Sequence, residues 1–132
     1  MTERTLDQRR AEHALAKIRE LSKQEYKNYV SYVKALPATI LQNGLGQAMA
    51  TLLSASKGRR ADDHYQLYAH VEDWLLHEMP DSPYAGQDDL MQAITTNNED
   101  AYVFAQAEAL AYLDWLKKLA RAHLKQPEQE ED

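Results

Sequence analysis

The apolar residues of this chain recur at intervals of three and four positions, the spacing that places side chains on one face of an α-helix. Between about 6 and 22, for example, Ala14 and Ile18 share one face while Arg10 and Lys17 lie on the opposite side. Sustained alternation of polar and apolar residues, which marks a half-buried strand, is missing from the sequence. The pattern therefore predicts an all-α fold, a single compact bundle of about five to six helices.

Turn and cap residues divide this pattern into segments. Pro37 disfavours helical geometry in the residue before it and suits the first turn of a helix, so we expect one helix to end and another to begin there. Asp62 or Asp63 can cap the next helix, and Thr96 and Glu99 have the spacing of a capping box. We expect helices over about 6–22, 24–35, 38–56, 63–79, 87–94 and 99–124.

The last of these helices has a broad apolar arc, which is typical of a helix that several others contact in a bundle. The arc consists of Phe104, Ala105, Ala109, Tyr112, Trp115, Leu116 and Leu119. We expect other helices to pack against this arc.

Length and composition limit the class of protein. A chain of 132 residues is long enough for one domain with a real core, and we assign residues 1–126 to it and 127–132 to an acidic, disordered tail. With no cysteine, disulfides, thiolate zinc sites and cysteine nucleophiles are excluded. No run of 18 apolar residues and no signal-peptide core is present, so we expect a cytoplasmic protein that makes no membrane contact.

Charge is unevenly distributed along the chain. Residues 1–60 carry eleven Lys and Arg against five Asp and Glu, whereas residues 61–127 carry four against twelve. A basic half beside an acidic half indicates either a surface with distinct partners or two solvated faces. Charge alone leaves both interpretations open.

The stretch "LPATILQNGLGQAMATLL", residues 36–53, places Asn43, Gly44 and Gly46 inside the most hydrophobic part of the chain. It lacks the third glycine and preceding strand of a dinucleotide-binding loop and the Gly-Lys-Ser/Thr of a Walker loop. Gly44 and Ala48 instead form a small-xxx-small step, which lets another helix approach closely. We therefore interpret Pro37, Asn43, Gly44 and Gly46 as a helix-packing motif.

Two groups of basic residues are candidates for contact with nucleic-acid phosphates. The alternative is that each is an ordinary solvated side chain. A helix-turn-helix regulator is another possibility, but the basic turn "KGRRADD" leads into an acidic helix, whereas that fold needs a basic recognition helix. The candidates are Arg9, Arg10 and Lys17 in the first segment and Lys57, Arg59 and Arg60 after the third.

A metal-dependent hydrolase would rest on His70, Asp73 and His77, which share one helical face. The two histidines are two turns apart, roughly 10 Å along a helix, which is too far to share one ion easily. No catalytic triad or carboxylate pair stands out beside them. We therefore expect no metal, no cofactor and no enzymatic activity.

Two stretches carry a resemblance to a known family. "LPATILQNGLGQAMATLL" and "EALAYLDWLKKLARAHL", residues 108–124, resemble the small subunit of type III-B CRISPR effector complexes, the Cmr small-subunit family. "DQRRAEHALAKI" and "YQLYAHVEDWLL" are also similar to that family, and the resemblance spans about 6–124.

The resemblance implies an all-helical, non-catalytic subunit of an RNA-guided antiviral complex. Copies of such a subunit stack along the guide RNA–target duplex and stabilise bound target, while other subunits cut RNA and make signalling nucleotides. The implied partners are other CRISPR effector subunits, further copies of the chain, guide RNA and target RNA. Alone, the chain is expected to be monomeric.

Overall fold

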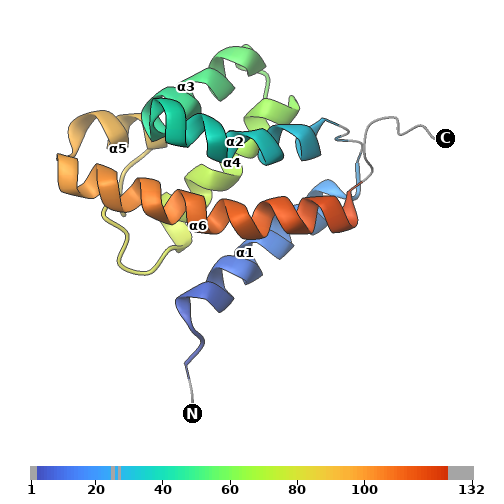
Figure 1. The fold of residues 1–132 in the computed structure, drawn as a ribbon, viewed down its shortest axis with the longest axis horizontal. Coiled ribbons are helices and arrows are strands. Elements are labelled where there is room, and N and C mark those ends of the chain that lie inside the picture. Colours follow the sequence, from blue (N-terminus) through green and yellow to red (C-terminus); the bar gives the residue numbers. More distant parts are fainter. Residues whose placement is uncertain (1–2, 25, 27, 125–132) are drawn as a thin grey trace.

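Helices account for nearly all of the regular structure in the computed structural model, which describes residues 3–24, 26 and 28–124. The acidic tail expected at 127–132 lies outside these residues. Within them the chain forms no strand, and the expected all-α fold is confirmed (Figure 1). The elements are α1 (Leu6–Leu21), α2 (Tyr29–Asn43), α3 (Leu45–Ser56), α4 (Asp63–Asp73), a π-helical turn η1 (Trp74–Glu78), α5 (Leu90–Thr96) and α6 (Glu99–His123).

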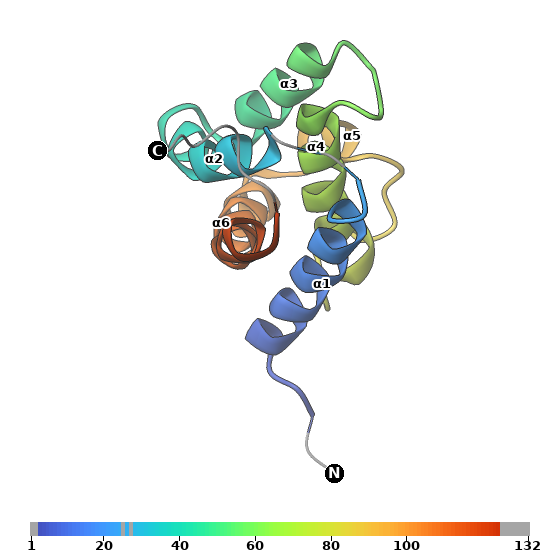
Figure 2. The same ribbon diagram turned by 90° about the vertical axis from the view of Figure 1, so that its right-hand side faces the viewer.

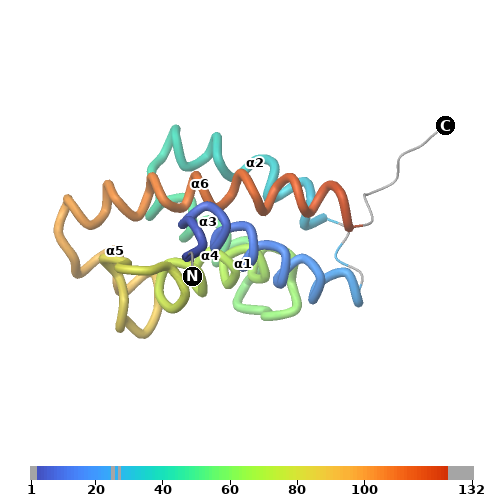
Figure 3. The backbone as a smooth tube through the Cα atoms, turned by 90° about the horizontal axis from the view of Figure 1, so that it is seen from below, coloured from blue at the N-terminus to red at the C-terminus, as the bar shows by residue number. Residues whose placement is uncertain are grey.

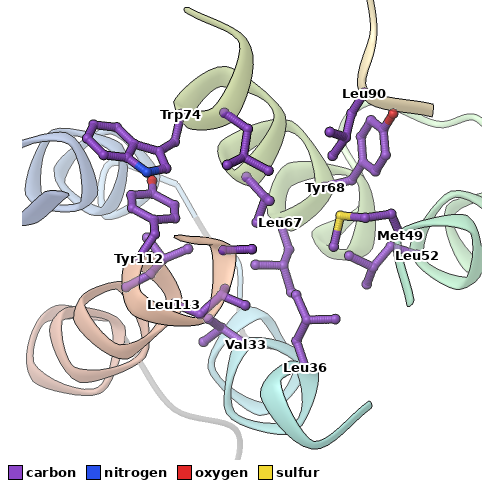
Figure 4. Packing of buried hydrophobic residues seen from close by; sticks show 14 of the residues in the cluster. Val33, Leu36, Met49, Leu52, Leu67, Tyr68, Trp74, Leu90, Tyr112 and Leu113 are labelled. Carbon is purple, nitrogen blue, oxygen red and sulfur yellow. The ribbon is translucent and has the colours of Figure 1, made fainter. Parts of the chain in front are cut away.

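The long helix α6 organises the bundle. It packs against α1 and α2, while α4 packs against α2 and α3. Figures 2 and 3 show α2 and α6 side by side, with α1 on another side of α6. Trp74 of η1 stacks on Tyr112 of α6, with ring centroids 5.4 Å apart, at one end of a core that continues through Leu67 and Met49 (Figure 4). None of the helices in the described part of the chain is long and apolar enough to cross a membrane.

The helix break expected at Pro37 is wrong. Pro37 lies inside α2, which continues to Asn43, and the break comes at Gly44, with φ 90° and ψ 158°. Proline costs α2 one backbone hydrogen bond. However, Val33 and Ile40 on either side of it are both fully buried on the same stripe, and their burial keeps the helix continuous.

Two other local expectations need correction. The capping box proposed for Thr96 and Glu99 does not form, because Thr96 is the last residue of α5. Asn98 caps α6 instead, and its side chain accepts from the N–H of Ala101 at 2.9 Å. Phe104, which was assigned to the packed apolar arc of the last helix, is 52 % exposed. Of the two residues that could cap α4, Asp62 is the cap: its side chain accepts from the N–H of His64 at 2.7 Å, and Asp63 is the first residue of the helix.

The helix that follows α4 widens at its end. The N–H of Met79 donates to the carbonyl of Trp74 at 2.8 Å, a five-residue step. This π-turn places Trp74, Leu75 and Leu76, three successive residues, in the core. An ordinary α-helix would turn one of them toward solvent.

Candidate nucleic-acid interface

The turn between α3 and α4 presents three basic side chains to solvent: Lys57, Arg59 and Arg60. Lys57 adopts the left-handed conformation, with φ 53°. The buried Ser56 holds the turn together, since its hydroxyl accepts from the N–H of Gly58 at 3.2 Å and its carbonyl from the N–H of Arg59 at 3.0 Å. The turn is therefore an ordered platform for its cations.

These cations remain available. Neither Lys57 nor Arg59 forms an ion pair within the part of the chain that the structure describes. The Arg60 guanidinium lies over the Tyr65 ring, 5.4 Å from its centroid, which leaves its N–H donors unpaired with any carboxylate of the described residues. Unpaired guanidinium and ammonium groups are the donors that bind phosphate oxygens. We name Lys57, Arg59 and Arg60 the basic turn.

The basic residues of α1 are in a different situation. Arg10 donates to both carboxylate oxygens of Glu108 on α6, from Nε at 2.6 Å and from Nη2 at 2.8 Å, and a third donor contacts Asp7 at 3.0 Å. Glu108 is buried and also accepts from the indole N–H of Trp74 at 2.9 Å. The hydrogen bond to Glu108 raises the pKa of Arg10. Arg10 therefore fastens α1 to α6 and has little capacity left for a phosphate.

Lys17 also has an internal partner. Its ammonium lies 3.5 Å from the carboxylate of Asp73, which accepts from His13 Nε2 at 2.7 Å. The other ring nitrogen of His13 lies 2.6 Å from the Tyr112 hydroxyl. Burial lowers the pKa of His13, and the hydrogen bond to Asp73 opposes part of that effect. Lys17 therefore neutralises the same carboxylate that binds His13.

Only Arg9, among the three basic candidates of α1, is exposed and without an ion pair in the described chain. The basic turn and the N-terminal half of α1 do not come together. Figures 1 and 2 both place the α3–α4 turn at one side of the molecule and the start of α1 at the opposite side. The basic candidates therefore form two separate regions, of which the basic turn holds three available cations and α1 holds one.

His70, Asp73 and His77, the candidate metal ligands, have separate surroundings in the described part of the chain. His70 is buried, and its Nδ1 lies 2.7 Å from the Tyr29 hydroxyl. Burial lowers the pKa of His70 to about 3, so the ring is neutral. His77 is exposed on the π-turn, and Asp73 is bound to His13. Among the described residues, no group of three such side chains is placed to hold a metal ion.

The glycine motif forms an elbow between α2 and α3 against α6. A Cβ added to Gly44 would lie 2.7 Å from the Tyr102 hydroxyl oxygen. That hydroxyl accepts from the N–H of Gly46 at 3.0 Å, and the Gln106 side chain accepts from the N–H of Leu45 at 2.9 Å. Two side chains of α6 therefore cap the first turn of α3. Asn43 is exposed, and Pro37 lies within α2.

The family model for "CRISPR-associated protein (Cas_Cmr5)" matches residues 6–123, nearly the whole described chain. This chain belongs to the Cmr5 family. It is also similar to the crystal structure of a CRISPR-associated Cmr5 family protein from Thermus thermophilus, with 28 % identity and a TM-score of 0.73. That match covers 93 % of this chain and 100 % of the other. A Cmr5 protein is the small subunit of the type III-B Cmr complex, as the resemblance had indicated.

Sequence reasoning missed two features of this Cmr5 chain. The first is the contact between Arg10 and Glu108, which are 98 positions apart. Glu108 could have been singled out in the sequence, because a carboxylate on the apolar arc of α6, between Ala105 and Ala109, indicates a buried charge that needs a partner. The second is Tyr65 beneath Arg60 across the turn.

Proposed function

We propose that this Cmr5 chain is a non-catalytic small subunit that stacks with copies of itself along the guide RNA–target duplex and stabilises bound target through its basic turn. The observation that carries the proposal is the contrast between the two basic regions. Lys57, Arg59 and Arg60 keep their donors available, whereas Arg10 and Lys17 are bound to internal carboxylates. Arg9 is a secondary contact.

Charge along α6 supports stacking of copies. The chain has no Lys or Arg between 61 and 116, and α6 begins with the exposed carboxylates of Glu99 and Asp100. Lys117 and Lys118 follow near its other end, where they share one internal carboxylate, Asp114, at 3.8 Å and 3.1 Å, so one positive charge remains in excess among the three. Because α6 runs along the longest axis of the molecule (Figure 1), an acidic end can meet a basic end of the next copy. Such contacts are weak in isolation, so the free chain is monomeric.

The test is the affinity of the assembled complex for target RNA as a function of salt. Replacing Lys57 and Arg59 by Glu should weaken binding and reduce the slope of log K against log salt by about 0.7 to 0.9 for each phosphate that is no longer bound. The matched control is Arg19→Glu with Lys23→Glu, which reverses two exposed charges on and after α1. If both pairs have the same effect, overall charge and not the basic turn governs binding, and the proposal is wrong.

The absence of catalysis is tested on the isolated chain. We expect neither RNA cleavage nor nucleotide polymerisation with magnesium, manganese or zinc present. Cleavage that co-purifies with the chain and is lost in His70→Ala would favour the hydrolase interpretation instead.

A further inference from the structure

Tyr65 differs from the other tyrosines of this chain in its relation to the core. The chain has eight tyrosines, and the other seven are either buried or packed against the core cluster. Tyr65 is half-buried near the start of α4, and its ring is inclined at 51° to that of Tyr68, with centroids 6.0 Å apart, so the two rings are not stacked face to face. Its hydroxyl makes no hydrogen bond within the described chain. Core packing alone therefore does not account for an aromatic side chain at this position.

The Tyr65 ring lies beneath the basic turn. The Arg60 guanidinium is 5.4 Å from the centroid of the ring. The Gln66 side chain donates to the carbonyl of Arg60 at 2.6 Å, and Ser56 anchors the other end of the turn, so the backbone between them is held at both ends. The Arg60 side chain itself is exposed and can move aside without breaking an ion pair of the described residues. The ring and the three cations therefore form one ordered surface.

The two carboxylates that follow the basic turn are occupied elsewhere. Asp62 accepts from the N–H of His64 at 2.7 Å and lies 2.8 Å from Nδ1 of the same residue. Asp63 accepts from the N–H of Asn28, the residue before α2, at 2.8 Å. Neither carboxylate forms an ion pair with the basic turn among the described residues. The turn therefore keeps donors for phosphates next to an aromatic ring.

An aromatic ring beside phosphate-binding cations is the combination that binds unpaired nucleotides. The cations contact the backbone, and a base of any sequence can stack on the ring because every base has a π-face. Bases inside a duplex are stacked on their neighbours, so an unpaired base is the one that reaches a ring. We infer that Tyr65 stacks on one unpaired base of the bound RNA while the basic turn holds the adjoining phosphates. The inference rests on the proposed function and adds the kind of nucleotide that the turn takes.

Arg60 has a different position in the free and the bound protein under this inference. A cation over an exposed ring is held more weakly than a base stacked on an aromatic side chain, so a base displaces the guanidinium. The displaced guanidinium keeps its charge and its donors, which suit the phosphate of the same nucleotide. Arg60 therefore covers the Tyr65 ring until RNA binds and then becomes a phosphate contact.

The experiment measures the affinity of the assembled complex for target RNA over a range of salt concentrations, with native mass spectrometry to confirm that each variant is incorporated. Tyr65→Ala removes the ring, and Tyr65→Phe keeps it and removes the hydroxyl. The control is Phe104→Ala, because Phe104 is an exposed aromatic side chain in a stretch, 101–107, without charge. We expect Tyr65→Ala to bind roughly 5- to 100-fold more weakly with an unchanged slope of log K against log salt, since stacking releases no counter-ions. Tyr65→Phe should retain the wild-type affinity because it retains the ring, and the control should also bind as wild type does.

A second measurement changes the RNA and keeps the ring. Target RNAs with one abasic nucleotide at successive positions keep every phosphate and lack one base each. Loss of a paired base weakens binding to wild type and to Tyr65→Ala alike. At the base that Tyr65 takes, we expect the abasic nucleotide to weaken binding to wild type by the same factor as Tyr65→Ala does, and to have no further effect on that variant.

The remaining outcomes overturn the inference. Tyr65→Ala binding equal to wild type, or an abasic series that affects both proteins alike at every position, shows that no base stacks there. Equal losses for Tyr65→Ala and Tyr65→Phe would assign the contact to the hydroxyl, and a smaller salt slope for Tyr65→Ala would show that the ring only supports the cations. The proposed function is tested separately: it stands if Lys57→Glu with Arg59→Glu reduces the slope even where Tyr65→Ala has no effect, and it fails if that pair has no effect.

Discussion

The buried ion pair between Arg10 and Glu108 makes a strong prediction about stability. The Glu108 side chain is 4 % exposed and accepts three hydrogen bonds, two from Arg10 and one from Trp74. Removing one partner of a buried pair costs about 3–5 kcal/mol, because the other charge stays buried without compensation. In Glu108→Ala, Arg10 keeps its contact with Asp7 and some solvent, which places the destabilisation near the lower end, about 3 kcal/mol. In Arg10→Ala, the carboxylate keeps only the Trp74 donor, and we expect about 4–5 kcal/mol.

Urea unfolding followed by tryptophan fluorescence measures these changes in the free energy of unfolding. Trp74 lies in the core and reports directly on the site. The matched control is Glu12→Ala, which removes an exposed ion pair with Arg4 and should cost less than about 1 kcal/mol. A double variant, Arg10→Met with Glu108→Leu, should recover much of the stability because no unpaired charge remains. If Glu108→Ala unfolds within about 1 kcal/mol of Glu12→Ala, the pair does not fasten α1 to α6 and the reasoning fails.

Three further outcomes are expected. Gly44→Ala should lower the free energy of unfolding by about 2–3 kcal/mol in urea, because its φ of 90° strains any residue with a side chain and the added Cβ would meet Tyr102. Gly58→Ala is the control: its φ is 76° but nothing lies near the added Cβ, so it should cost only about 1 kcal/mol. Equal costs for the two variants would contradict the close approach of Tyr102 to Gly44. Burial lowers the pKa of His70 to about 3, so below pH 6.5 the unfolded chain binds more protons than the folded chain. The free energy of unfolding should therefore fall by about 2 kcal/mol between pH 6.5 and 5. If a His70→Asn variant shows the same pH dependence, other groups cause it. Adding EDTA should leave the melting temperature unchanged, since His70 is bound to Tyr29, and a drop would reveal a metal.

Outside residues 24–44, the helix positions followed closely from the sequence, because burial imposes a period on apolar residues and that period is local. The continuity of α2 through Pro37 did not follow. Local geometry favoured a break there, whereas the burial of Val33 and Ile40, which depends on α4 and α6, favoured continuity. The observed break at Gly44 needs a positive φ, which glycine adopts readily. From the sequence, Gly44 could serve either this backbone conformation or the close packing of two helices, and nothing in the sequence separated the two.

The candidate site followed from the sequence in part. Basic residues are easily found, but whether a cation is available depends on carboxylates brought near by folding. Arg10 and Lys57 look equivalent in sequence, yet Arg10 meets Glu108 from the far end of the chain and Lys57 meets no carboxylate in the described residues. Such long-range pairings leave no local pattern, so the sequence alone could not separate the two basic regions.

The N-terminal cap of helix α3 depends on side chains that the ribosome adds much later in synthesis. Its first N–H groups, on Leu45 and Gly46, find their acceptors in Gln106 and Tyr102, which lie 61 and 56 positions further along the chain. During synthesis, α3 therefore leaves the ribosome without its N-terminal cap and is completed only when α6 docks. Amide hydrogen exchange at Leu45 and Gly46 should consequently report the docking of α6, and both amides should exchange at the rate at which α6 detaches rather than at the rate of local fraying.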